Sequence, residues 1–231
     1  WAEWSVSEMK DKFDIDSWYE TNPSMGYHLT ERKIEAELGD DDLDHNVQRL
    51  GYWPKYNQKS AISMEEWDAL AYQRLPKLVT PLYVGIKYGN DGANVAMSIA
   101  AKTSTDKVFA EAIDCQSVRN GNGWILDFIS KANVEMVVVD GASGQDLLSA
   151  EMRRAKIRPY PILPKVKEVI TAYSAFERGI HLETIAHKNQ PSLTQVVTNS
   201  EKRPIGSNGG FGYKSQFEDY DVALLDSVAL A

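Results

Sequence analysis

The stretch Val134-Glu135-Met136-Val137-Val138-Val139-Asp140-Gly141-Ala142-Ser143-Gly144 decides the fold of this chain. Its nearly continuous β-branched run predicts a strand that is buried on both faces of a sheet. The run ends at one carboxylate, Asp140, and a helical pattern begins a few residues later. Ligand crevices of α/β sheets open at the carboxyl ends of strands, so Asp140 is either a functional carboxylate or the cap of the following helix.

Three β-prone runs precede this strand, at 82–88, 94–102 and 107–115. The sequence Gly89-Asn90-Asp91-Gly92 between the first two is a strong hairpin signal, so we predict three sequential antiparallel strands. Later patterns predict helices at 121–131, through 147–152, at 166–178 with Gly179 as its stop, from Pro191, and from about Asp219 to the end, with a short strand at 157–162. Three antiparallel strands followed by alternating helices and strands is the ribonuclease H-like order. We therefore predict an α/β fold with a mixed central sheet flanked by helices.

Acidic residues are concentrated in the first third of the chain. Residues 1–75 hold 8 Lys and Arg against 16 Asp and Glu, whereas the remaining residues are balanced at 17 of each. Such an asymmetry favours two segments with different partners. We predict an acidic, Trp-rich joining segment at 1–78, too poor in apolar periodicity for a large core, and a ribonuclease H-like domain at 79–231. Within the joining segment, Ser63-Met64-Glu65-Glu66 is a capping box that predicts the start of a helix.

Several function classes are excluded by composition. No apolar run is long enough for a membrane span, and the first residues of the sequence do not have the charged-then-apolar form of a signal peptide. A single cysteine, Cys115, excludes an internal disulfide and a cysteine-based zinc site, and we expect it to be a small core residue. Because the chain begins at Trp1 rather than at a methionine, we expect it to be part of a longer polypeptide.

The predicted fold sets the chemistry to look for. Nucleases with this fold cleave phosphodiester bonds with two divalent cations about 3.5–4 Å apart, which carboxylates from separate elements hold. Oxygen ligands suit Mg²⁺ or Mn²⁺. We expect ligands on the first strand, at the end of the fourth strand and at the start of a late helix. These positions point to Asp140 and Asp219, with Asp221 and Asp226 as further candidates; the alternative for each helix carboxylate is simple solvation, and for Asp219 an N-cap.

Three regions of the chain resemble one protein family. Asp219-Tyr220-Asp221-Val222-Ala223-Leu224-Leu225-Asp226 resembles its closing helix, and Val138-Val139-Asp140-Gly141 its second acidic motif. Asn22-Pro23-Ser24-Met25-Gly26 and Arg49-Leu50-Gly51-Tyr52-Trp53 resemble the region that joins a packaging ATPase to a nuclease. The family is the large terminase subunit of tailed bacteriophages, and the similarity covers its C-terminal nuclease domain with part of the joining segment.

This resemblance implies a function and a set of partners. The chain would be a divalent-metal-dependent endonuclease that cuts concatemeric double-stranded DNA during genome packaging in the host cytoplasm. Its partners would be the ATPase domain of the same polypeptide, the portal and the small terminase subunit, and no membrane. The chain itself contains no Gly-x-x-x-x-Gly-Lys-Ser/Thr phosphate loop, so we predict no ATPase activity.

One position departs from the family pattern. The family's first acidic motif places an aspartate two residues after the glycine of the first strand, whereas this chain has Lys87 after Gly85-Ile86. The nearest carboxylate is Asp91 in the hairpin, which either supplies the missing ligand or is only a turn residue. Lys87 itself, instead of being a metal ligand, would neutralise the scissile phosphate or weaken one metal site.

Contacts with DNA are expected to be sequence-independent and directed at phosphates. Besides Lys87, the candidates are Arg153, Arg154, Lys156, Arg158, Lys165 and Lys167 in one basic cluster, and Lys202, Arg203 and Lys214 beside the glycine-rich stretch 207–212. The alternative for these clusters is a solvated surface.

Two other functions stay open from the sequence. Lys87 at a ligand position favours a catalytically weak module that docks DNA or the portal. The fold order alone also fits another ribonuclease H-like nuclease, such as a resolvase or transposase, although the acidic joining segment speaks against it.

Overall fold

The computed structural model describes residues 4–6, 10–38, 42–52, 60–89, 92–206, 209–217 and 221–231. The chain divides into two compact units, Trp1–Asn57 and Gln58–Ala231. Each unit has hydrophobic core residues of its own. No helix in the described part of the chain is long and apolar enough to cross a membrane.

The first unit is helical. Helices α1 (Ile15–Thr21), α2 (Glu31–Glu37) and α3 (Asp42–Arg49) enclose a small core of Val6, Trp18, Met25, Ile34 and Leu50. The Val6 N–H donates to the Leu50 carbonyl at 3.1 Å, which connects the two ends of this unit. The acidic, Trp-rich segment therefore builds a core of its own, although its apolar periodicity is weak.

The second unit is built on a five-stranded sheet in the order β4-β1-β2-β3-β5. Its strands are β1 (Leu82–Tyr88), β2 (Asn94–Lys102), β3 (Val108–Ser117), β4 (Val134–Asp140) and β5 (Ile185–Ala186). Strands β1, β2 and β3 are antiparallel neighbours, whereas β4 pairs parallel with β1 and β5 parallel with β3. This mixed sheet, flanked by helices, confirms the predicted fold class.

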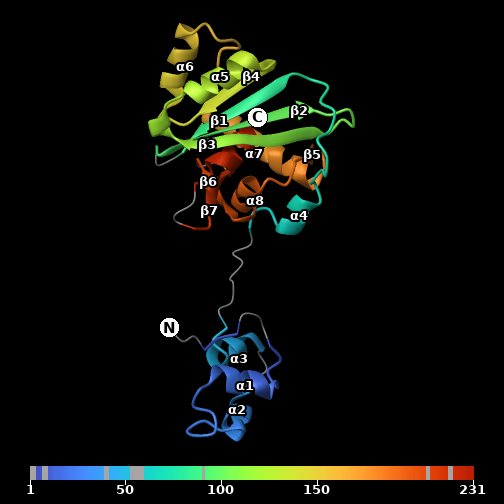
Figure 1. Cartoon of the computed structure of the whole chain (residues 1–231), viewed down its shortest axis with the longest axis vertical. Helices are drawn as coiled ribbons and strands as arrows, with labels where there is room; N and C mark the ends of the chain where they lie inside the picture. The colour runs from blue at the N-terminus through green and yellow to red at the C-terminus, as the bar shows by residue number, and fades with distance from the viewer. Residues whose placement is uncertain are drawn as a thin grey trace. The chain divides into compact units, whose positions relative to one another are not determined.

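Helices cover both faces of the sheet (Figure 1). One face packs on α5 (Gly123–Lys131) and α6 (Gln145–Arg154), around Ile86, Val137, Val139 and Leu148. The other face packs on α7 (Val166–His181), α8 (Pro191–Thr198) and α9 (Ala223–Leu230), together with the hairpin of β6 (Ser200–Ile205) and β7 (Gly210–Ser215). Strand β4 lies at one edge of the sheet, so Glu135 and Met136 are exposed while Val137 and Val139 are buried. The predicted burial on both faces therefore does not hold for the whole strand.

Helix α4 (Met64–Asp68) belongs to this second unit. The predicted capping box is present: the Ser63 side chain accepts from the Glu66 N–H, and the Glu66 carboxylate accepts from the Ser63 N–H. Ile62, Trp67 and Leu70 lie in the core beside α7 and α8. Residues that the sequence placed in the joining segment thus pack with the sheet unit.

Some sequence expectations differ from the structure. The predicted strand at 157–162 is reduced to one bridge between Ile162 and Val138, and the fifth strand is formed by Ile185 and Ala186. Helix α7 passes through Gly179, the predicted stop, and ends at His181. A Cβ at Gly179 would lie 2.6 Å from the Ile185 Cδ1 atom, so this glycine allows β5 to approach the helix.

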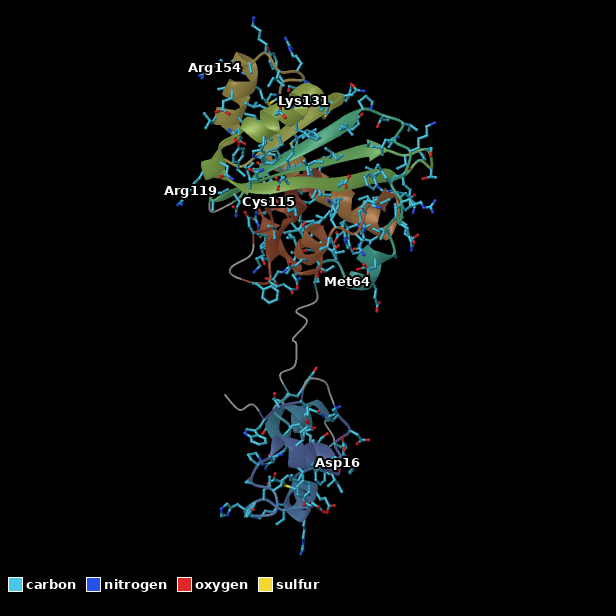
Figure 2. All side chains as sticks on the ribbon, in the orientation of Figure 1. Asp16, Met64, Cys115, Arg119, Lys131 and Arg154 are labelled. Atoms are coloured by element: carbon cyan, nitrogen blue, oxygen red, sulfur yellow. The ribbon has the colours of Figure 1, made fainter. Side chains whose placement is uncertain are left out.

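The lone cysteine is not a core residue as predicted. Cys115 is exposed on β3 (Figure 2). Strand β5 pairs with β3 only at Val108 and Phe109, so the later part of β3 lies at the edge of the sheet.

Candidate functional site

Two charged side chains meet where β1 and β4 end. The parallel register places Lys87 opposite Asp140, and the Lys87 ammonium forms an ion pair with the Asp140 Oδ2 atom. Alternation along β1 places Lys87 on the same face as Gly85, which is the face covered by α9. The structure therefore directs Lys87 into the protein rather than toward solvent, and its side chain is 8% exposed.

Helix α9 reaches this site because Gly85 lets it approach the sheet. A Cβ at position 85 would lie 2.0 Å from the Ser227 carbonyl oxygen and 2.6 Å from the Ala231 nitrogen. Ser98, the β2 partner of Gly85, shares a hydrogen bond of 2.6 Å with the Ser227 hydroxyl. This close packing sets the position of Asp226, the residue before Ser227.

Asp226 is the second carboxylate of the site. Its Oδ2 atom lies 4.0 Å from the Lys87 Nζ atom, and its side chain is 1% exposed. Among the residues that the structure describes, neither of its carboxylate oxygens has a hydrogen-bond partner of normal geometry. Buried carboxylates normally have their hydrogen bonds satisfied. Asp140 and Asp226 therefore converge on one ammonium group, and the Tyr173 hydroxyl is a further polar neighbour of Asp226, although their contact lacks normal hydrogen-bond geometry.

The burial of Asp226 changes its acidity. Loss of solvent raises the pKa of this carboxyl to about 7, and the nearby Asp221 adds to the rise. Lys87 opposes the rise most strongly, followed by the Tyr173 hydroxyl of α7 and by Arg203 of β6. Burial likewise raises the pKa of Tyr173, with a further contribution from Asp226. Asp226 thus belongs to a cluster of polar residues that includes Lys87 of β1, Tyr173 of α7 and Arg203 of β6.

The other predicted carboxylates have different positions. Asp91 and Asp219 lie outside the described residues. The Asp221 Oδ1 atom accepts the Ala223 N–H at 3.0 Å in the turn before α9. The N-cap of this helix is Val222, and the helix begins at Ala223 rather than near Asp219. No group of three or more His, Cys, Asp or Glu side chains that could hold a metal occurs in the described part of the chain.

The basic residues of β6 and β7 are largely engaged within the protein. Lys202 forms an ion pair with Glu177 and lies 4.6 Å from the centroid of the Phe211 ring. Lys214 lies 2.6 Å from Glu201. The Arg203 Nε atom donates to the Tyr213 carbonyl at 3.0 Å, and its charge acts on Asp226. Arg203 therefore acts on Asp226 through its charge, a role that the sequence does not suggest.

The second basic cluster is exposed. Arg153, Arg154, Lys156, Arg158, Lys165 and Lys167 all have exposed side chains. Arg154 lies at the end of α6 (Figure 2), in the layer on the opposite face of the sheet from α9. The guanidinium of Arg158 stacks 3.8 Å from the centroid of the Tyr160 ring.

Lys165 follows a short contact with β4. Ile162 forms a parallel bridge with Val138, and its carbonyl accepts the Val139 N–H at 2.9 Å. Lys165 comes three residues after Ile162 and is the N-cap of α7. The bridge therefore brings the segment before Lys165 beside the strand that ends at Asp140.

The sequence does not reveal Tyr173 and Arg203 as neighbours of the carboxylates. Tyr173 is one apolar-face residue of α7 among several, and no local feature distinguishes it. The sequence makes Arg203 a DNA-binding candidate beside the glycine-rich stretch, but gives no sign of its relation to the carboxylates. Their relation to Asp226 depends on contacts between elements that are distant in the sequence.

The donor set can be tested against the divalent ions that the fold implies. Asp140 and Asp226 provide the oxygen ligands that Mg²⁺ and Mn²⁺ prefer, and both Asp226 oxygens are buried without a hydrogen bond of normal geometry from a described residue. The Lys87 ammonium, however, lies beside the Oδ2 atoms of both residues. These two carboxylates could hold one divalent ion, and the positive charge of Lys87 disfavours a second one.

No protein-family model and no curated protein matches this chain. Solved structures do share its fold. The HK97 bacteriophage large terminase is 13% identical with a TM-score of 0.52, over 98% of this chain and 56% of that chain. The large terminase nuclease from thermophilic phage G20c, solved with bound magnesium, is 13% identical with a TM-score of 0.53, over 74% of this chain and 96% of that chain. The same nuclease with bound cobalt is 13% identical with a TM-score of 0.50, over 74% of this chain and 96% of that chain.

These similarities confirm the predicted fold. This chain has the fold of large terminase nucleases from several phages, and the match covers most of its length. It spans slightly more than half of the HK97 protein.

Proposed function

We propose that this chain is the nuclease part of a phage large terminase, which cuts concatemeric double-stranded DNA in the host cytoplasm during genome packaging. The observation that supports the proposal is the convergence of the Asp140 and Asp226 carboxylates, from β4 and α9, beside one buried ammonium group. The fold of large terminase nucleases, one of which was solved with bound magnesium, supports it. The ATPase domain of the same polypeptide, the portal and the small terminase subunit are the expected partners.

The residues divide into those that hold an ion and those that hold DNA. Asp140 and Asp226 would be the ligands of Mg²⁺ or Mn²⁺; Asp91 and Asp219 remain predicted ligands, and Asp221 orients the start of α9. A divalent ion, when bound, activates a water molecule for attack on the phosphate and stabilises the leaving oxygen. Lys87 holds the Asp140 carboxylate in place, and Arg203 adds positive charge near Asp226.

The exposed lysines beside the site bind the DNA backbone. Asp140 is partly accessible, with 19% of its side chain exposed, so a phosphate can approach it from the end of the sheet. Lys165 and Lys167 are exposed at the start of α7, near the same end. Phosphate contacts carry no sequence information, so these residues would bind any DNA sequence.

The test is cutting of supercoiled plasmid DNA in the presence of Mn²⁺. We expect the chain to linearise the plasmid, and we expect D140N and D226N each to reduce cutting to background, because each removes a charged ligand. The matched control is D127N, which makes the same change at an exposed aspartate on α5 that pairs with Lys131. Full activity of D140N would contradict the proposal.

A second function is favoured by Lys87. An ammonium at a ligand position suits a catalytically weak module that holds DNA or the portal. Such a module would bind DNA equally well as wild type or as D140N, would never cut it, and would show no Mn²⁺ binding that depends on Asp140 and Asp226. Calorimetric titration with Mn²⁺ separates the two functions.

A further inference from the structure

Lys87 has a position that is unusual for a lysine. Its ammonium lies between the carboxylates of Asp140 and Asp226, and 8% of its side chain is exposed. Burying a charged group is costly unless opposite charges compensate it. Two carboxylates provide that compensation here, so the group Lys87, Asp140 and Asp226 is one buried electrostatic unit.

The same position is where an ion would bind. A divalent ion that bridges Asp140 and Asp226 must lie close to oxygens of both, and Mg²⁺ requires ligand distances of about 2.0–2.1 Å. The Lys87 ammonium already lies beside the Oδ2 atoms of both residues. An ammonium and a metal ion cannot share this volume, and their like charges repel strongly in a site of low dielectric.

We propose that the Lys87 ammonium replaces one of the two divalent ions expected for this fold. The chain would therefore bind a single divalent ion, with Lys87 in place of the other. Asp140 supports this inference, because its Oδ2 atom pairs with Lys87 while 19% of its side chain stays exposed, so an ion can reach this carboxylate from solvent. The inference rests on the proposed function for the expectation that an ion binds at all.

The proposal is tested by counting bound Mn²⁺ ions. Isothermal titration calorimetry of the whole chain should give one Mn²⁺ per chain for wild type and two for K87D, because an aspartate replaces the blocking cation by a ligand. The matched control is K102D, the same substitution at an exposed lysine of β2, which should bind one ion as wild type does. Two ions or none in the wild-type protein would overturn the proposal, as would one ion in a folded K87D.

A second variant and a second method cover the case in which K87D does not fold. K87M removes the charge but keeps an apolar chain of similar length, and it should bind its Mn²⁺ about tenfold or more tightly because the repulsion is gone. Unchanged affinity would contradict the proposal. Electron paramagnetic resonance of wild type with excess Mn²⁺, corrected for free ion, should show an isolated Mn²⁺ rather than an exchange-coupled pair.

These measurements separate the ion count from the reaction. A wild-type protein that binds one Mn²⁺ but cuts no DNA would leave this inference standing and would argue against the proposed nuclease. A protein that binds two ions and cuts DNA would support the proposed nuclease and contradict this inference.

Discussion

Gly85 shows how a single residue sets the geometry of the site. Its missing side chain lets the backbone of α9 lie against β1, and that contact places Asp226 beside Lys87 and Asp140. The contacting atoms at Ser227 and Ala231 belong to the backbone, so they cannot move aside as a flexible side chain would. The sequence shows Gly85 plainly, but only the packing explains why that strand position carries a glycine.

We expect G85A to destabilise the second unit by about 3 kcal/mol, the upper end of typical overpacking costs. The added methyl would displace α9 and with it Asp226, so Mn²⁺ binding should weaken as well. The free energy of unfolding measured in urea, together with calorimetry, checks both effects. The control is G123A in α5, where the added Cβ would have no atom within 4 Å. A G85A protein as stable as wild type would contradict this account of the α9 contact.

At the scale of elements, His187 joins α4 to the segment between β5 and α8. Its ring stacks on Trp67 with 3.8 Å between centroids and an interplanar angle of 12°. The Nδ1 atom accepts the Asn189 N–H at 2.9 Å, so the Nε2 atom carries the proton and donates to the Trp67 carbonyl at 2.8 Å. Both ring nitrogens are thus used by the neutral form. Burial lowers the pKa of His187, an effect partly offset by the Trp67 carbonyl and by Asp68.

This burial predicts loss of stability in acid. Because the folded pKa of His187 lies below the ordinary value of 6.5, the unfolded chain binds a proton that the folded protein does not. The contribution of His187 to the free energy of unfolding is therefore complete above pH 6.5. It is lost as the pH falls, with a slope of at most about 1.4 kcal/mol per pH unit. Urea unfolding between pH 8 and pH 5 should show that H187Q lacks this slope, whereas H181Q, at an exposed histidine, keeps it. An equal slope in wild type and H187Q would disprove the assignment.

At the scale of the whole molecule, the distribution of charge matters more than its sum. The chain carries a formal net charge of −8, which by itself would disfavour binding to DNA. The excess acid belongs to residues 1–75, whereas the exposed basic residues cluster on α6, on the segment after it and at the start of α7. A DNA-binding surface is therefore compatible with an acidic chain.

This distribution predicts which lysines act on DNA. The double variant K165Q/K167Q should weaken DNA binding and lower the slope of log K against log salt by about 2, because each lost phosphate contact contributes about 0.9. Fluorescence anisotropy with duplex DNA at several salt concentrations measures this slope. The control K102Q/K131Q removes the same charge from exposed lysines of β2 and α5 and should change the slope little. Equal slopes for both double variants would assign the effect to net charge alone.

Much of the fold could be predicted from local patterns. The bounds of β1, β2 and β4 agree with the apolar runs, and Pro191 begins α8 as its fixed φ predicts. The site was only partly predictable. Asp140 is conspicuous because a carboxylate ends an apolar strand there. The predicted start of α9 was wrong, because Asp221 and Val222 lie in a turn and the helix begins at Ala223.

The sequence by itself determined the three antiparallel strands, the apolar strand that ends at Asp140, and the anomaly of a lysine in place of an acidic ligand. Those features follow from alternation, turn residues and spacing, which act between neighbours in the chain. Only the tertiary structure decided that Asp226 faces Lys87, and that Tyr173 and Arg203 surround them. Those contacts join residues far apart in the sequence, and they depend on how closely α9 packs on the sheet at Gly85.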